Sequence, residues 1–185
     1  SLHDALPIST PMKPEMVGPV IVESSSSYLS KRAAKTTVAQ VMVQCSNRLA
    51  PMRHIDANGL RFRAYERGTG SRLALLLHGF PDDAGSMLPL AERLAAGGFR
   101  VVAPFMRGYA PTNRPRNGDY GVDALGRDVI GLIDALAMGP AVVIGHDWGA
   151  VAAYAAAALA PDRFTRLIGL SVPPGKALIQ NLSRD

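Results

Sequence analysis

The chain has 185 residues, of which 48% are hydrophobic and 19% charged; this is the composition of one globular domain and excludes a disordered or collagen-like chain. Its net charge of +5 is spread along the sequence, which favours a solvated basic surface over a nucleic-acid-binding face. A single cysteine, Cys45, excludes a disulfide framework, and the apolar run at residues 151–160 is too short to cross a membrane. We therefore expect a cytoplasmic protein that binds neither nucleic acid nor a membrane.

Residues 1–50 differ from the rest because they show no sustained hydrophobic period and contain four prolines and a run of serines at 24–27. Their basic residues lie too deep in the segment for a secretory signal. The opening residues 1–9 resemble a peptide read from sequencing-adapter DNA, which would place the real start at Met42 or Met52; a disordered natural leader is the alternative. We divide the chain into a disordered or artefactual leader, residues 1–50, and a core domain, residues 51–185.

From residue 51 onward, strand and helix patterns alternate. A hairpin is predicted first, with strands Met52–Asp56 and Leu60–Glu66 joined by the turn signal Asn58-Gly59. The elements expected after it are strand Leu73–Leu77, helix Ser86–Ala96, strand Phe99–Ala103, loop 105–120, helix Val122–Leu136, strand Ala141–Ile144, helix Ala150–Ala160 and strand Arg166–Leu170. This order predicts an α/β fold, with a mostly parallel sheet and helices on both of its faces.

The segment Gly-His-Asp-Trp-Gly at residues 145–149 lies between an expected strand and an expected helix. It has the pattern of a nucleophile elbow, with Asp147 at the position of the nucleophile. Glycines permit the sharp turn, and the dipole of the following helix favours a carboxylate at its N-terminus. The alternative is that Asp147 is an ordinary N-cap residue.

A second motif, His-Gly-Phe-Pro at residues 78–81, directly follows the strand Leu73–Leu77. In elbow folds, one backbone N–H of the oxyanion hole comes from this loop and the other from the residue after the nucleophile. We therefore predict that Phe80 and Trp148 supply these two backbone donors and that Asp147 is the nucleophile. The supporting residues expected around them are His78, Gly79, Pro81, Gly145, His146 and Gly149.

Together with Arg107-Gly108-Tyr109 and Thr112, these motifs resemble the α/β-hydrolase fold superfamily, in its branch of epoxide hydrolases and haloalkane dehalogenases with an aspartate nucleophile. Only the N-terminal part of the family pattern is matched. The resemblance implies an incomplete α/β-hydrolase fold with strands 1 to about 6, lacking the lid and the C-terminal part. It also implies that Asp147 opens a small apolar epoxide, or displaces a halide, through an alkyl-enzyme ester that water then hydrolyses.

In the family, a histidine oriented by an acid activates that water. None of the four histidines of this chain follows Asp147; they are His3, His54, His78 and His146. The resemblance therefore implies an α/β hydrolase whose sequence, as it stands, is inactive in turnover. No metal-ligand or phosphate-loop pattern is present, so we expect no cofactor.

The substrate class depends on Phe80, which stands where dehalogenases of this branch often carry an asparagine that helps to hold the halide. Phenylalanine has no side-chain donor, and this favours an epoxide hydrolase. A haloalkane dehalogenase, or another α/β hydrolase with an aspartate elbow, is the alternative. A non-catalytic fragment or interaction module is the alternative from a different class. We also expect poor stability, because the last strand, Arg166–Leu170, would have an open edge.

Overall fold

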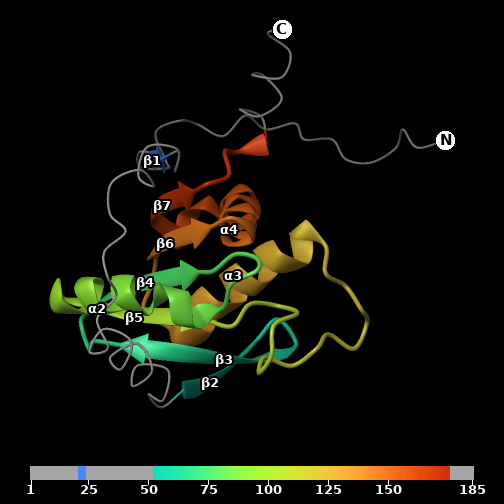
Figure 1. The fold of residues 1–185 in the computed structure, drawn as a ribbon, viewed down its shortest axis with the longest axis horizontal. Helices are drawn as coiled ribbons and strands as arrows, with labels where there is room; N and C mark the ends of the chain where they lie inside the picture. The colour runs from blue at the N-terminus through green and yellow to red at the C-terminus, as the bar shows by residue number, and fades with distance from the viewer. Residues whose placement is uncertain (1–20, 24–51, 176–185) are drawn as a thin grey trace, which may run out of the picture.

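The computed structural model describes residues 21–23 and 52–175, which contain one seven-stranded sheet with the order β1-β7-β6-β4-β5-β3-β2 (Figure 1). The strands β3–β2 and β3–β5 pair antiparallel and all other neighbours pair parallel. This confirms the predicted α/β fold. The strands are β1 (Ile21–Glu23), β2 (Met52–Ala57), β3 (Leu60–Arg67), β4 (Arg72–Leu77), β5 (Phe99–Pro104), β6 (Ala141–His146) and β7 (Phe164–Leu170). The helices are α2 (Leu88–Ala96), α3 (Val122–Leu136) and α4 (Trp148–Leu159), with short 3-10 turns η2 (Ala84–Met87) and η3 (Pro161–Arg163).

The β2–β3 hairpin turns at Asn58 and Gly59, whose φ angles of 45° and 74° are both positive. A two-residue hairpin loop needs positive φ at both positions, which asparagine and glycine tolerate best. The flanking residues Ala57 and Leu60 pair directly, and the predicted hairpin is confirmed.

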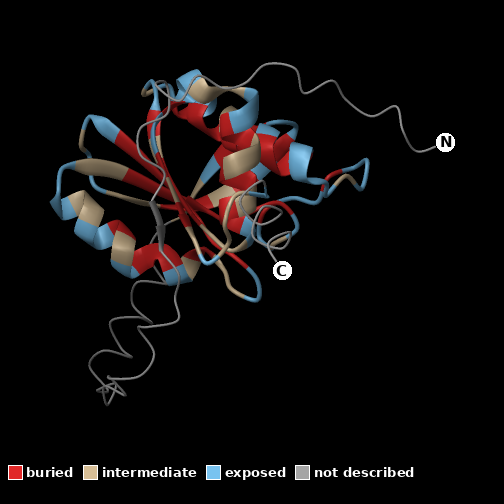
Figure 2. Cartoon of the chain, turned by 90° about the horizontal axis from the view of Figure 1, so that it is seen from above, coloured by how far each residue is buried: buried red, intermediate tan, exposed pale blue. Residues whose placement is uncertain are grey.

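Alternate residues of β4 face the two sides of the sheet, as the period of a strand requires. Leu73, Leu75 and Leu77 belong to the core cluster that includes α3 and α4, whereas Ala74 and Leu76 belong to the cluster that includes α2. Figure 2 shows buried residues along the central strands and on the helix sides that face them. Helices therefore cover both faces, as predicted.

Two helix starts differ from the prediction. The segment from Ser86 is not yet α-helical, because the Asp83 side chain accepts the Gly85 N–H at 2.7 Å and caps the 3-10 turn η2, and α2 begins at Leu88. Helix α4 begins earlier than predicted, at Trp148, because the carbonyl of Asp147 already accepts the N–H of Ala150 at 2.9 Å.

Strand β1 lies beside β7 and pairs with it in parallel over Ile168–Leu170. The open edge expected along Arg166–Leu170 is therefore wrong for these residues. The division into a leader, residues 1–50, and a core domain, residues 51–185, stays a prediction. Within residues 21–23 and 52–175, no helix is long and apolar enough to span a bilayer.

Candidate active site

Asp147 lies between β6 and α4 with φ 52° and ψ −116°, a conformation that costs a residue with a side chain roughly 1–3 kcal/mol. Hydrogen bonds on both sides of the residue hold it there. Its N–H donates to the carbonyl of Leu170 at 3.1 Å, and its carbonyl accepts from Ala150 and Val151 at 2.9 and 3.2 Å. The carboxylate makes no capping hydrogen bond to α4, so Asp147 is not an ordinary N-cap residue.

The glycines around Asp147 are required by close backbone contacts. A Cβ on Gly145 would lie 2.3 Å from the carbonyl oxygen of Gly149, and one on Gly149 would lie 2.2 Å from the carbonyl oxygen of Leu77. A Cβ on Gly79 would lie 2.5 Å from the Cβ of Asp147. These approaches are shorter than van der Waals contact, so the elbow and the loop after β4 pack together only with glycine at all three positions.

The loop after β4 reaches the nucleophile position, because β4 and β6 are neighbours in the sheet and Leu77 pairs with Gly145. The backbone N–H of Phe80 donates to Oδ1 of Asp147 at 3.0 Å. The peptide bond from Phe80 to Pro81 is cis. The two motifs thus meet as the sequence predicts, with one predicted donor on the carboxylate.

Trp148, which carries the other predicted donor, is the first residue of α4, so its N–H has no acceptor within its own helix. The side chains of Trp148 and Phe80 are exposed, at 49% and 66%. His146 is the half-buried last residue of β6 and pairs with Leu170. Phe80, His146 and Trp148, which we call the rim residues, thus adjoin Asp147 in sequence or through a hydrogen bond, and the roles expected of them stay predictions.

His78 is fully buried beneath this rim. Its Nε2 accepts the backbone N–H of Met106 at 3.1 Å, so the ring proton is on Nδ1, which donates to the carbonyl of Gly79 at 3.0 Å. Burial lowers the pKa of His78, although the hydrogen bond to Gly79 and the charges of Asp82 and Asp83 oppose this effect. His78 is therefore a neutral ring with both nitrogens occupied, and the role expected of it in shaping the loop stays a prediction.

The loop 105–120 lines a cavity beside Trp148, which we did not expect from the composition of the loop. Tyr109 packs edge-on against His78, with ring centroids 4.6 Å apart. Burial, followed by the charges of Asp147 and Asp82, raises the pKa of Tyr109, so its phenol is protonated at neutral pH. The only signal for this position is the Arg-Gly-Tyr motif itself. A cavity of about 220 Å³ is lined here by Met106, Arg107, Tyr109, Tyr120, Leu125 and Trp148.

Arg107 forms a buried ion pair with Asp128 of α3, with Nε to Oδ2 and Nη2 to Oδ1 both at 2.7 Å. This hydrogen bonding raises the pKa of Arg107 further, against the opposing effect of burial. Asp128 had no part in the predicted site, because an acid on a helix face is usually solvated.

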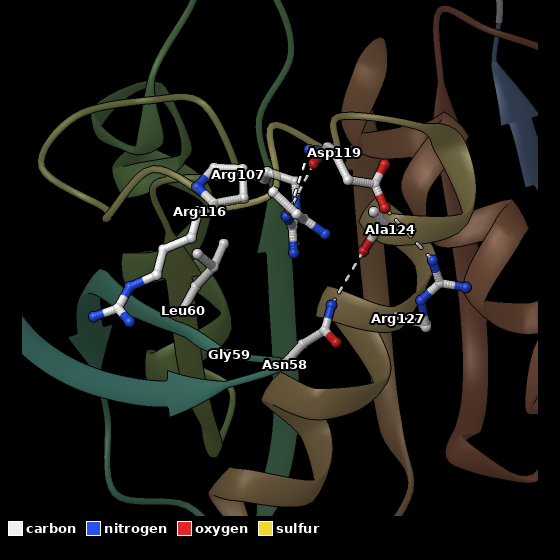
Figure 3. Close-up of a pocket in the computed structure, with 10 residues that line it drawn as sticks. Asn58, Gly59, Leu60, Arg107, Arg116, Asp119, Ala124 and Arg127 are labelled. Atoms are coloured by element: carbon white, nitrogen blue, oxygen red, sulfur yellow. Dashed lines mark hydrogen bonds and ion pairs between the residues drawn. The ribbon is translucent and has the colours of Figure 1, made fainter.

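A second cavity of about 300 Å³ lies between the tip of the β2–β3 hairpin, the loop 115–119 and the start of α3 (Figure 3). It includes Arg107 in its lining but neither Asp147 nor Phe80. We place the candidate site at Asp147 because its carboxylate accepts the backbone N–H of Phe80 and because its neighbour Trp148 lines the apolar cavity of about 220 Å³, whose lining contains neither Asp147 nor Phe80. Among residues 21–23 and 52–175, no group of three His, Cys, Asp or Glu side chains could hold a metal ion.

Comparisons with known proteins agree with this geometry. A family model described as alpha/beta hydrolase fold matches residues 75–184. The chain is 42% identical over 120 residues to an epoxide hydrolase from Caballeronia sordidicola, covering 64% of this chain and 36% of the relative. It is 41% identical over 123 residues to epoxide hydrolase A of Mycobacterium tuberculosis, covering 65% and 38%.

Solved structures give the same result. Epoxide hydrolase VrEH1 from Vigna radiata matches with a TM-score of 0.64 and 34% identity over 67% of this chain and 41% of that chain. Epoxide hydrolase A from Mycobacterium thermoresistibile matches with a TM-score of 0.64 and 35% identity over 73% and 45%. The chain thus spans about two fifths of the length of these proteins. Its elbow, its sheet order and these matches together show that it belongs to the α/β hydrolase fold family and that, within the family, it is similar to epoxide hydrolases.

Proposed function

We propose that this chain carries the nucleophile of an epoxide hydrolase and that the nucleophile is Asp147. One observation carries the proposal: at the tip of a strained elbow, the carboxylate of Asp147 is held by the backbone N–H of Phe80 at 3.0 Å. The names of the relatives, which are epoxide hydrolases, support the same chemistry. The activity of the whole protein is part of this proposal.

The first step is alkylation of Asp147. Because Phe80 engages Oδ1, Oδ2 is the oxygen that attacks. A lone pair of Oδ2 forms a bond to one epoxide carbon, and the bond from that carbon to the ring oxygen breaks. The ring oxygen leaves as an alkoxide and takes a proton from water, which gives a hydroxide ion and a β-hydroxyalkyl ester on Asp147.

The second step is hydrolysis of this ester. Water adds to Cγ of Asp147, and negative charge develops on Oδ1, where the N–H groups of Phe80 and Trp148 would stabilise it. The bond from Cγ to the alkyl oxygen then breaks, releasing a diol and the carboxylate. One proton of the attacking water goes to a general base and from there to the leaving alkoxide, and the other neutralises the hydroxide formed in the first step, so that Asp147 is again ionised.

His78 cannot act as that base, because both of its ring nitrogens are engaged with Met106 and Gly79. His54 lies on the edge strand β2, four positions from β6 in the sheet order, and faces Arg63. We assign His146, the half-buried last residue of β6, a structural role. With no base assigned among residues 21–23 and 52–175, we propose that the alkyl ester persists on this chain. A missing general base typically slows a step by roughly 10²–10⁴-fold.

The substrate proposed is an epoxide with an apolar substituent. A halide ion leaving the site would need side-chain donors, and the exposed Phe80 offers none. The cavity beside Trp148 is lined mainly by apolar side chains, namely Met106, Tyr109 and Leu125 among others. Both features favour a neutral, largely apolar substrate over a halide-releasing one.

The test is intact-mass spectrometry of the full chain after incubation with styrene oxide, with Asp147→Asn as the matched control. We expect one added molecule of styrene oxide on the parent, mapped to Asp147 by peptide analysis, and little on the control. Equal labelling of both proteins would mean that Asp147 is not the nucleophile. Continuous diol formation by the parent would show that the chain has a base that we have not identified.

A further inference from the structure

We propose that the buried ion pair between Arg107 and Asp128 is a positioning device for the reactive centre: acting through Met106 and His78, it holds the Phe80 loop against Asp147. The inference rests on the proposed role of Asp147 and assigns functions to Arg107, Asp128 and His78, which act on the reactive centre through other groups. All three are therefore positioning residues.

The first link is the anchoring of Arg107. Both members of the pair are almost fully buried, with 4% and 6% of their side chains exposed. Arg107 also donates from Nη1 to the carbonyl of Asp119 at 3.0 Å, and Asn58 donates to Oδ1 of Asp128 at 2.6 Å. Figure 3 shows Arg107 and Asp119 meeting above the start of α3, with Asn58 approaching from the hairpin tip. One ion pair therefore joins the loop, the helix and the hairpin.

The second link runs from this anchor to the elbow. The neighbour of Arg107 in sequence, Met106, donates its N–H to Nε2 of His78 at 3.1 Å. His78 donates from Nδ1 to the carbonyl of Gly79 at 3.0 Å, and the next N–H, that of Phe80, donates to Asp147 at 3.0 Å. Three successive hydrogen bonds thus connect the loop 105–120 to the carboxylate.

The energetics favour positioning over stability as the purpose of the pair. Burying two ions costs several kcal/mol of desolvation per ion, and apolar replacements of buried pairs are often at least as stable. The loop 105–120 contains no helix or strand, so hydrogen bonds must fix its path. Thr112 supplies a second tie by donating to the carbonyl of Phe105 at 2.7 Å and accepting the N–H of Arg63 at 3.1 Å. The bidentate geometry of an arginine fork sets both distance and orientation, which a packed apolar side chain does not.

Small displacements of the Phe80 loop matter because Asp147 reacts only in an aligned geometry. A misplacement of about 1 Å can cost on the order of 10²-fold in rate. The cavity lining includes Met106, Arg107 and Trp148, so the same anchor also fixes one wall of the substrate site.

The test uses two substitutions that divide the contacts of His78. His78→Gln keeps an acceptor near the position of Nε2 for Met106, whereas His78→Asn keeps a donor for Gly79 but is too short to reach Met106. Arg107→Lys keeps the charge and loses the fork. The readout is the amide proton of Phe80 in a ¹H–¹⁵N spectrum of the full chain, because a hydrogen bond to a carboxylate moves that signal downfield. The matched control is the amide of Gly85, which donates to Oδ1 of Asp83 at 2.7 Å outside this pathway.

We expect the Phe80 signal to lie downfield in the parent and to move upfield in His78→Gln, which loses the donor to Gly79. The signal should also move upfield in His78→Asn and Arg107→Lys, which lose contacts on the Met106 side of the pathway, while the Gly85 signal stays in place. Labelling of Asp147 by styrene oxide should slow by roughly 10–100-fold in the same three variants. An unchanged Phe80 signal in all three variants overturns the inference. Labelling at Asp147 at the parent rate in all three variants also overturns it but leaves the proposed function intact. A responsive Phe80 signal without labelling at Asp147 supports the positioning and contradicts the proposed function.

Discussion

Replacing Gly149 by alanine tests whether the elbow depends on direct backbone contact between α4 and β4. The added Cβ would lie 2.2 Å from the carbonyl oxygen of Leu77, 2.6 Å from its carbonyl carbon and 2.8 Å from the carbonyl oxygen of His78. All three atoms are backbone atoms of β4 or of the residue after it, so no side chain can rotate away. The helix or the strand must move by about 1 Å to restore ordinary van der Waals contact.

The expected cost follows from two opposing effects. Overpacking of this kind typically costs about 1–3 kcal/mol, and a backbone clash belongs at the upper end of that range. Alanine in place of glycine within a helix returns about 1 kcal/mol. We therefore expect Gly149→Ala to lower the free energy of unfolding by about 2 kcal/mol, which corresponds to a fall in Tm of roughly 4–8 °C for a chain of this size.

Thermal unfolding followed by circular dichroism measures this change, with Gly175→Ala as the matched control. No heavy atom lies within 4 Å of a Cβ built on Gly175, so that variant should stay within about 0.5 kcal/mol of the parent. A Gly149→Ala protein that melts at or above the parent temperature would refute the reasoning. In that case the close approach of α4 to β4 would not be a constraint on the fold.

Two further predictions concern stability. Glu66 is partly buried, which favours its neutral form, but hydrogen bonds from Arg100 and Arg53 outweigh this and hold its pKa below the ordinary value of 4.5. Because the pKa of Glu66 is lowered in the folded protein, its ion pairs stabilise the fold fully above the ordinary pKa of 4.5, and this stabilisation is lost as the pH falls through the folded pKa. In urea unfolding, the stability advantage of the parent over Glu66→Gln should therefore shrink from about pH 6 to about pH 3. A constant difference would contradict this assignment. Leu132 is only 1% exposed, so Leu132→Ala should lower the free energy of unfolding by about 2–5 kcal/mol in the same assay. Leu159 is 54% exposed, so Leu159→Ala should leave the free energy of unfolding nearly unchanged. Similar losses for the two variants would contradict the described core.

The parts of the fold that were predictable are those with a local signal. Helix α3 was predicted with its observed bounds, because Leu125, Val129, Leu132 and Leu136 recur with the helical period on one face. The hairpin turn was predictable from Asn58-Gly59. Strand β1 was not predictable, because its three residues pair with residues 147 positions later and carry no alternating pattern of their own.

In the candidate site, too, features with a local sequence signal were predictable and contacts between distant segments were not. The elbow and the Phe80 loop were predictable because glycine spacing after a strand is a local signal that reflects close backbone approach. The ion pair of Arg107 and Asp128 was not predictable, since nothing in a single sequence shows that an acid on α3 is buried against a loop 21 residues earlier. The same holds for the edge-on packing of Tyr109 against His78, which depends on how the loop 105–120 folds back.

The location of the candidate site also follows from the connectivity of the sheet. From β4 the chain passes through α2, which covers one face of the sheet, and enters β5, a neighbour of β4. It then returns through α3, which covers the opposite face, and enters β6, the neighbour of β4 on its other edge. The loops that leave the carboxyl ends of β4 and β6 therefore lead to helices on opposite faces of the sheet, at the point where the strand order reverses, which is where open α/β sheets place their sites. Asp147 at the end of β6 and Phe80 after β4 meet there and are joined by one hydrogen bond. The strained backbone of Asp147 is tied in turn to β7 through Leu170. The geometry of Asp147 is thus a property of three neighbouring strands, and the proposed action of the Arg107–Asp128 pair on it would pass through the loop that follows β4.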